Sequence, residues 1–159
     1  MQSMSENEPM LDERLLLEAA REARKKAYAP YSKFLVGAAI LDDQGNLHKG
    51  CNVENAAYPQ GTCAEAGAIA AMILAEGKQI KAIAVVGESP DPVTPCGGCR
   101  QKIREFAGST TPILIGDLKQ LRLRLTLAEL LPHSFGPEYL LKSPCLLYTS
   151  DAADELRSV

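Results

Sequence analysis

Three cysteines and one glutamate form the part of this sequence best suited to chemistry. Cys63 and Glu65 are separated by one residue, and Cys96 and Cys99 form a C-x-x-C pair. Zinc in proteins takes about four ligands, and a catalytic zinc keeps one position for water. Three thiolates and a water satisfy that number, which leaves Glu65 free to move protons. We therefore predict that Cys63, Cys96 and Cys99 bind Zn²⁺, one ion per chain, and that Glu65 is the catalytic residue.

Two other uses of these cysteines stay open at this point. A C-x-x-C pair at a helix start is also the layout of thiol–disulfide oxidoreductases, but such a pair needs no third cysteine and no nearby glutamate. A structural zinc site, as in a zinc-stabilised interaction module, would need a fourth protein ligand. Cys51 lies in a predicted strand, where a small buried core residue is expected, and His48 and His133 have no ligand spacing.

The composition limits the classes of partner. The chain has 159 residues, of which 46% are hydrophobic and 23% charged, with a net charge of −3; this describes one ordinary globular domain. Lys and Arg form no long run, so we expect no nucleic-acid partner. The longest apolar stretch, residues 68–75, is too short for a bilayer, so we expect no membrane contact. The odd number of cysteines and the lack of a secretory signal predict a cytoplasmic protein.

The two ends of the chain differ from its middle. We predict a disordered N-terminal arm over residues 1–10 and a single catalytic domain over residues 11–141. Residues 142–159 have no periodicity that joins the preceding fold, and they look like read-through of a vector or adapter. We expect a non-native or disordered tail there and give Cys145 no role.

Hydrophobic periodicity predicts an α/β fold, specifically a three-layer α-β-α sandwich with a mixed, roughly five-stranded sheet. The expected helices cover residues 11–28, 63–77, 96–106 and 126–131, and the expected strands cover 34–41, 47–53, 80–87, 112–116 and 121–125. Thr62 and Gly77 are the expected caps of the second helix, and Thr126 and Glu129 have capping-box spacing. Gly37 and Gly50 indicate places where backbone or ligand approaches a strand closely. Cys63 and Cys96 then begin two helices, whose N-terminal dipoles offset thiolate charge.

Several stretches beyond the cysteines resemble the small homotetrameric zinc-dependent cytidine deaminases. These are PYSKF at 30–34, VGAA at 36–39, NVENAAY at 52–58, CAE at 63–65, PCGGCRQ at 95–101 and SFGP at 134–137. The zinc pattern alone is common to nucleobase deaminases in general. The NVEN and SFGP stretches make the resemblance specific to enzymes of free nucleosides, and it extends from about residue 28 to 140.

The resemblance implies a cytidine deaminase-like fold and a reaction. Cytidine and deoxycytidine would be hydrolysed to uridine and deoxyuridine with release of ammonia, a step of pyrimidine salvage. Glu65 would relay a proton from the activated water to ring N3 and then to the leaving amine. The partners would be the nucleoside, water and further copies of the chain, with sites at the subunit interfaces of a homotetramer.

The resemblance also implies how the nucleoside is held. Asn52 and Glu54 would bind the ribose hydroxyls, and Phe34 would pack against the pyrimidine. The Ala64 amide and the Thr94 carbonyl would address the base and its amino group. Tyr58 and Phe135 would help to close the site, partly from neighbouring subunits.

One position departs from the family pattern. Many relatives have arginine directly after the catalytic glutamate, where it hydrogen-bonds the thiolates, but this chain has Ala66. We expect helix amides, or Arg100 or Gln101, to offset the charge instead.

Two other deaminase activities share the zinc residues with cytidine deamination. A deaminase of a related nucleoside, such as a blasticidin-type antibiotic, would keep the zinc residues and differ around residues 52–58. A nucleic-acid deaminase is disfavoured by the acidic balance of the chain and the absence of a basic stripe.

Overall fold

The computed structural model of the chain describes residues 11–141. The predicted arm and tail at residues 1–10 and 142–159 lie outside this range and stay predictions. The helices and strands, in chain order, are α1 (Glu13–Arg24), β1 (Val36–Asp42), β2 (Leu47–Cys51), α2 (Ala64–Leu74), β3 (Ile80–Gly87), α3 (Gly97–Phe106), β4 (Pro112–Gly116), β5 (Leu121–Thr126) and α4 (Leu127–Leu130). Two short 3₁₀ helices, Tyr58–Gln60 and Pro137–Tyr139, lie in the connections.

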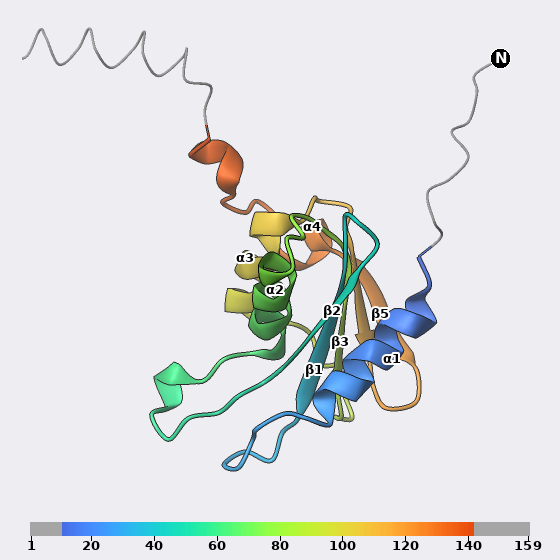
Figure 1. The fold of residues 1–159 in the computed structure, drawn as a ribbon, viewed down its shortest axis with the longest axis vertical. Coiled ribbons are helices and arrows are strands. Elements are labelled where there is room, and N and C mark those ends of the chain that lie inside the picture. The colour runs from blue at the N-terminus through green and yellow to red at the C-terminus, as the bar shows by residue number, and fades with distance from the viewer. Residues whose placement is uncertain (1–10, 142–159) are drawn as a thin grey trace, which may run out of the picture.

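The strands form one five-stranded sheet in the order β2-β1-β3-β4-β5. Neighbours are antiparallel except β3 and β4, which run parallel because α3 provides the crossover between them. Helix α1 covers one face of the sheet, and α2 and α3 cover the other (Figure 1). The predicted three-layer sandwich with a mixed sheet is confirmed.

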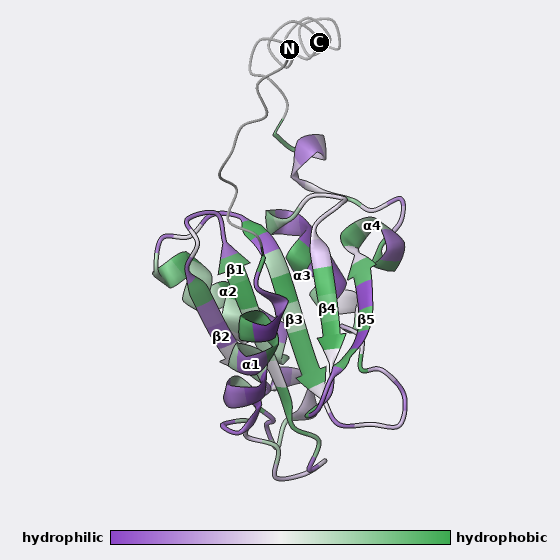
Figure 2. Cartoon of the chain, turned by 90° about the vertical axis from the view of Figure 1, so that its right-hand side faces the viewer, coloured by the Kyte–Doolittle hydropathy of each residue, from purple (hydrophilic) through white to green (hydrophobic). Residues whose placement is uncertain are grey.

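Each face of the sheet has its own hydrophobic core, because successive side chains of a strand point to opposite faces. In β1, Ala38 and Ile40 belong to the cluster beneath α2 and α3, whereas Ala39 belongs to the cluster beneath α1. Strand β3 is the middle strand and is buried along nearly its whole length. In Figure 2, β3 and β4 are hydrophobic along most of their length, as expected of strands covered on both faces.

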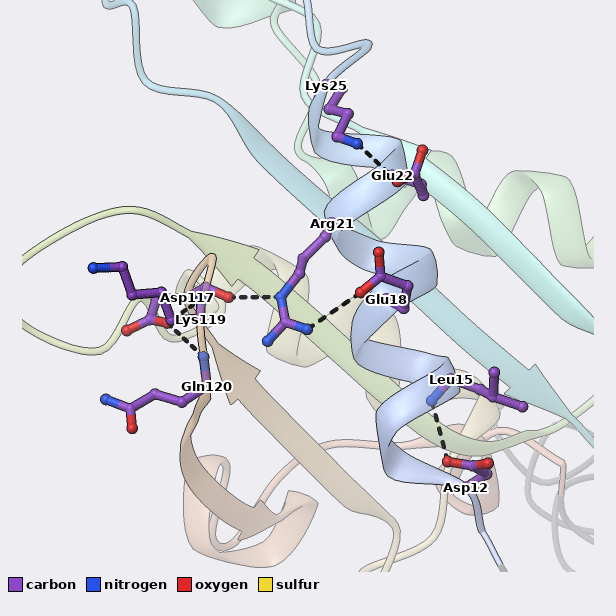
Figure 3. A network of polar contacts seen from close by, with 9 residues as sticks. All are labelled: Asp12, Leu15, Glu18, Arg21, Glu22, Lys25, Asp117, Lys119 and Gln120. Carbon is purple, nitrogen blue, oxygen red and sulfur yellow. Dashed lines mark hydrogen bonds and ion pairs between the residues drawn. The ribbon is translucent and has the colours of Figure 1, made fainter.

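Helix α1 is fixed at several points along its length (Figure 3). The Asp12 carboxylate caps its first turn by accepting from the Leu15 amide at 3.2 Å. Near the middle, Arg21 Nε donates to the Asp117 carbonyl at 2.9 Å, which ties the helix to the β4–β5 turn. Gly37 allows β1 to lie directly under the helix, because an added Cβ would be 2.0 Å from the Ala20 carbonyl oxygen.

The first helix is shorter than the periodicity predicts. It ends at Arg24 rather than at residue 28, and the prediction for its last turn is wrong. Tyr28 leaves the helix because its amide donates to the Asn52 carbonyl and its carbonyl accepts from the Glu54 amide. Pairing with a distant strand end therefore outweighs the local helical preference.

The predicted caps of α2 are also wrong. Thr62 does not cap the helix, because it pairs with Val53 through two backbone hydrogen bonds and Cys63 is the N-cap residue. At the other end, the left-handed residue is Glu76, with φ 68°. Gly77 is required by packing instead, since an added Cβ would lie 2.6 Å from Asp42 Oδ2.

Other local predictions hold. The strands over residues 80–87 and 112–116 have the predicted bounds, and the capping box of Thr126 and Glu129 is present. Within residues 11–141, the helices are all too short or too polar to cross a membrane.

Candidate metal centre

Two helix N-termini bring the three predicted sulfur ligands together. Cys63 is the N-cap residue of α2, Cys96 is the N-cap residue of α3, and Cys99 lies in the first turn of α3. Their Sγ atoms all lie within 4.8 Å of one another, and those of Cys63 and Cys96 are 3.9 Å apart. A tetrahedral zinc with Zn–S bonds of about 2.3 Å needs sulfurs roughly 3.8 Å apart. The three side chains therefore fit zinc.

A close backbone approach sets the position of α2. A Cβ added to Gly50 in β2 would lie 2.2 Å from the Ala68 nitrogen and 2.3 Å from the Ala64 oxygen. The first turn of α2 thus packs directly on β2, which confirms the close backbone approach expected at Gly50. Because Ala64 follows Cys63 and precedes Glu65, this contact also fixes the height of the ligand and of the carboxylate above the sheet.

The chemistry of the sulfurs also favours a cation. Burial raises the pKa of Cys63, and burial together with the Glu65 carboxylate raises the pKa of Cys99 far above its usual value. The Cys99 amide, which donates to the Cys96 sulfur, lowers the pKa of Cys96. Three clustered thiolates are therefore unfavourable without a positive ion, and a thiophilic metal such as zinc is the ion that such donors select.

Glu65 lies beside the sulfurs and is almost completely buried, with 4% of its surface exposed. Its Oε2 accepts from Cys99 Sγ at 3.5 Å. Burial is the largest cause that raises the pKa of this carboxyl. A carboxyl with a raised pKa holds a proton more readily than an ordinary glutamate, which suits a general acid–base group.

Arg100 and Gln101 do not replace the missing arginine at position 66. Within residues 11–141, both side chains donate to the C-terminal part of the domain or to the loop before Cys96, not to a ligand sulfur. The prediction that either one offsets the thiolate charge is wrong. The helix-amide alternative agrees with the Cys99 amide, which reaches the Cys96 sulfur.

Arg100 instead braces the loop that leads to Cys96. Its Nε donates to the Pro95 carbonyl at 2.8 Å, its Nη2 to Thr94 Oγ1 at 3.2 Å and its Nη1 to the Leu130 carbonyl at 2.9 Å. The planar guanidinium matches these three acceptors at once. Thr94, one of the predicted substrate contacts, is therefore held from α3.

Glu54 and Asn52 are held by the loop that precedes β1. Glu54 Oε1 accepts from the amides of Tyr31 at 3.0 Å and Ser32 at 3.1 Å. Asn52 Nδ2 donates to the Phe34 carbonyl and Asn52 Oδ1 accepts from the Val36 amide, both at 2.8 Å. This bonding explains why β1 begins at Val36 and not at residue 34. One Nδ2 proton of Asn52 remains for a ligand.

A pocket adjoins this loop. It has a volume of about 380 Å³ and is lined by Tyr31, Ser32, Glu54, Asn55, Tyr58 and Gly61. The rings of Tyr31 and Tyr58 meet edge to face with centroids 5.9 Å apart. Sequence reasoning did not single out Ser32 or Tyr31, although the S-x-F spacing after Pro30 is the pattern of a hydroxyl turn.

The predicted site residues thus fall into two groups. Cys63, Glu65, Cys96 and Cys99 form one cluster, with buried Ala64 between two of its members. Phe34, Asn52, Glu54 and Tyr58 gather around the loops at residues 28–36 and 52–62. Phe135 lies elsewhere: it stacks on Tyr139 at 5.1 Å, and its carbonyl accepts from Gln101. The residues Phe34, Tyr58 and Phe135 are 40%, 76% and 56% exposed.

Comparison with known proteins supports the metal centre. The family pattern described as "Cytidine and deoxycytidylate deaminase zinc-binding region" matches residues 10–115. The cytidine deaminase of Sporosarcina psychrophila is 42% identical over 130 residues, which cover 82% of this chain and 96% of that protein. The cytidine deaminase of Halalkalibacterium halodurans is 40% identical over 128 residues, covering 80% and 97%. The crystal structure of cytidine deaminase from Burkholderia pseudomallei superposes with a TM-score of 0.74 at 41% identity, covering 79% of this chain and 100% of that one.

Proposed function

Because the chain belongs to the cytidine and deoxycytidylate deaminase family, we propose that it hydrolyses cytidine to uridine and deoxycytidine to deoxyuridine, releasing ammonia. The observation that carries the proposal is the set of three sulfurs within 4.8 Å beside a buried carboxyl. The reaction belongs to the salvage of pyrimidine nucleosides.

The resident metal is zinc, held by Cys63, Cys96 and Cys99. When bound there, zinc supplies a Lewis acid that makes water nucleophilic at neutral pH. The N-terminal ends of α2 and α3 offset part of the thiolate charge, since Cys63 and Cys96 are the N-cap residues at the positive ends of the two helix dipoles.

Glu65 moves the protons. Its buried carboxylate takes a proton from the attacking water and delivers it to N3 of the base. It then passes a proton to the amino group, which leaves C4 as ammonia. The raised pKa of Glu65 supports this role, because the same group must hold a proton and release it within one turnover.

The remaining predicted residues hold the nucleoside. We assign the sugar hydroxyls to Asn52 and Glu54, whose side chains are oriented by hydrogen bonds to the loop before β1. Phe34 packs on the pyrimidine, and the Ala64 amide and Thr94 carbonyl read the base edge. Tyr58 and Phe135 close the site.

We further propose that the chain forms a homotetramer with its sites at subunit interfaces. Helix α2 is apolar on all sides, yet Ile73 is 47% and Leu74 is 87% exposed. Such a helix belongs in an interior. The loop with the 3₁₀ helix Tyr58–Gln60 also projects away from the body of the domain (Figure 1). A second copy of the chain would cover these apolar surfaces.

A cytoplasmic location is part of the proposal. Cys51, Cys63, Cys96 and Cys99 are all unpaired thiols. Reduced thiols and thiolate metal sites persist in the reducing cytoplasm. Fractionation of cells with an antibody against the protein tests this location.

The decisive experiment follows the ultraviolet absorbance of cytidine, deoxycytidine and a blasticidin-type antibiotic on the purified protein, with and without a chelator. We expect turnover of the two nucleosides, lost on chelation and restored by zinc. Glu65→Gln should lower kcat by about 10²–10⁴-fold while the zinc content stays near one per chain. Full activity of Glu65→Gln would refute the assigned proton transfer.

A further inference from the structure

We propose that Ser32 is a positioning residue, whose hydroxyl sets both the carboxylate of Glu54 and the backbone that carries the Phe34 ring. The inference rests on the proposed function, since Glu54 and Phe34 meet a nucleoside only there. Ser32 is not among the residues predicted to touch substrate.

Ser32 connects the two groups through one side chain. Its Oγ accepts from the Phe34 amide at 3.0 Å. A hydroxyl has one donor and two acceptor sites, so accepting from Phe34 leaves the Oγ proton free for the nearby Glu54 carboxylate. A hydrogen bond from the Ser32 side chain is the largest cause that lowers the pKa of Glu54. The Ser32 amide adds a second contact, to Glu54 Oε1 at 3.1 Å.

This arrangement prepares Glu54 to accept a hydroxyl group. The amides of Tyr31 and Ser32 both donate to Oε1, and Glu54 lines the pocket. A lowered pKa keeps the carboxylate charged, and a charged acceptor binds a sugar hydroxyl more strongly than a neutral one. The donors of the loop thus hold the Glu54 carboxylate in one position at the wall of the pocket.

The same hydroxyl stabilises a turn that the backbone does not favour by itself. Lys33, between Ser32 and Phe34, has φ 60°, a left-handed conformation that is uncommon for a residue with a side chain. The Phe34 amide is held by Ser32 Oγ, and the Phe34 carbonyl is held by Asn52 Nδ2 at 2.8 Å. The backbone of Phe34 is therefore held on both sides, which fixes the direction of its side chain; the residue is 40% exposed.

The test compares Ser32→Ala with Ser32→Thr on two substrates. One is cytidine, and the other is 2′,3′-dideoxycytidine, which has the same base and lacks the ring hydroxyls. For cytidine, Ser32→Ala should raise KM about tenfold, the scale of a hydrogen bond to a charged group, with kcat within about twofold. Ser32→Thr, which keeps the hydroxyl, should restore KM.

The substrate without the 2′ and 3′ hydroxyls separates a positioning role of Ser32 from general damage to the fold. The penalty of Ser32→Ala through Glu54 should be absent with dideoxycytidine, so its KM should rise no more than about twofold. The Phe34 amide should exchange its hydrogen about fivefold faster in Ser32→Ala, because it loses its acceptor. Ser109→Ala is the control, because Ser109 is exposed and its backbone carbonyl accepts from the Ala128 amide.

The outcomes are distinct. An unchanged KM for cytidine in Ser32→Ala, with an active wild type, overturns this inference and leaves the proposed function standing. An equal loss on both substrates, with unchanged exchange at Phe34, also overturns it. A wild-type protein that deaminates neither nucleoside refutes the proposed function, and the inference with it.

Discussion

Replacing Gly50 by alanine should displace helix α2 from strand β2 and thereby disrupt the metal centre. The added Cβ would lie 2.2 Å from the Ala68 nitrogen, and ordinary contact begins at 3.4 Å. The helix must therefore recede by at least about 1.2 Å, the difference between these distances. The Ala68 nitrogen and the Ala64 oxygen are both backbone atoms, so a rotamer change does not relieve the clash.

The displacement matters because the ligands sit on different helices. Cys63 and Glu65 move with α2, whereas Cys96 and Cys99 stay with α3. The 3.9 Å separation of Cys63 Sγ and Cys96 Sγ changes by a comparable amount, whereas zinc–ligand distances vary by only about 0.2 Å. Overpacking of this kind costs about 1–3 kcal/mol of stability, and a 1 Å misplacement lowers turnover by about 10²-fold.

The assay measures zinc per chain after gel filtration, the rate of zinc loss to a chelator, and cytidine turnover. Gly98→Ala is the matched control, since its added Cβ would meet only the flexible end of Lys102, at 3.8 Å. Gly98→Ala should keep its zinc and gain about 0.5–1 kcal/mol, because alanine favours a helix over glycine. If Gly50→Ala retained zinc and turnover like Gly98→Ala, the strand would not set the position of α2.

Three further predictions concern other parts of the domain. Arg100→Met should lower the free energy of unfolding in urea by about 1–3 kcal/mol and raise KM for cytidine, because Thr94 loses the hydrogen bond that holds it. Arg100→Lys, which lacks the planar guanidinium, should recover only part of the stability and of the KM. Full recovery would contradict the role of the guanidinium. Burial opposes ionisation of Asp42, but hydrogen bonds from His48 and two turn amides outweigh it and hold the pKa of Asp42 below 3.8. The stability that this carboxylate contributes is present above the unfolded-state pKa of 3.8 and is lost as pH falls through the lower folded-state pKa. In Asp42→Asn, the free energy of unfolding measured in urea should therefore fall less steeply from about pH 5 to 2. An unchanged pH dependence of that free energy would contradict the role of Asp42. Leu74→Glu should lower the mass measured by light scattering below that of a tetramer, and an intact tetramer would exclude this helix from the interface.

Local pattern was sufficient where packing and propensity agree. Strands β3 and β4 are short apolar runs ending in glycine, and their bounds follow from that alone. The cysteine spacing also predicted the metal cluster, because a C-x-E stretch and a C-x-x-C pair together form a ligand pattern of zinc deaminases.

Predictions failed where a partner distant in sequence decides. Helix α1 stops early because Tyr28 pairs with the end of β2, and Thr62 is taken from α2 by Val53. The role of Arg100 depends on which face of α3 meets the Leu130 carbonyl, and sequence spacing does not contain that information. Ser32 was missed for the same reason, because its link to Glu54 exists only after two loops meet.

The placement of the three cysteines also makes the bound metal a cross-link between distant parts of the chain. Cys96 and Cys99 alone would close only a small ring, but Cys63 lies 33 residues before Cys96. By the relation for covalent links, a cross-link that closes a loop of that length lowers the conformational entropy of the unfolded state, which stabilises the fold by about 3.7 kcal/mol. The loop contains all of α2 and β3, the helix on the catalytic side and the central strand. The metal ion of the reaction thus also stabilises the fold of the segment between Cys63 and Cys96.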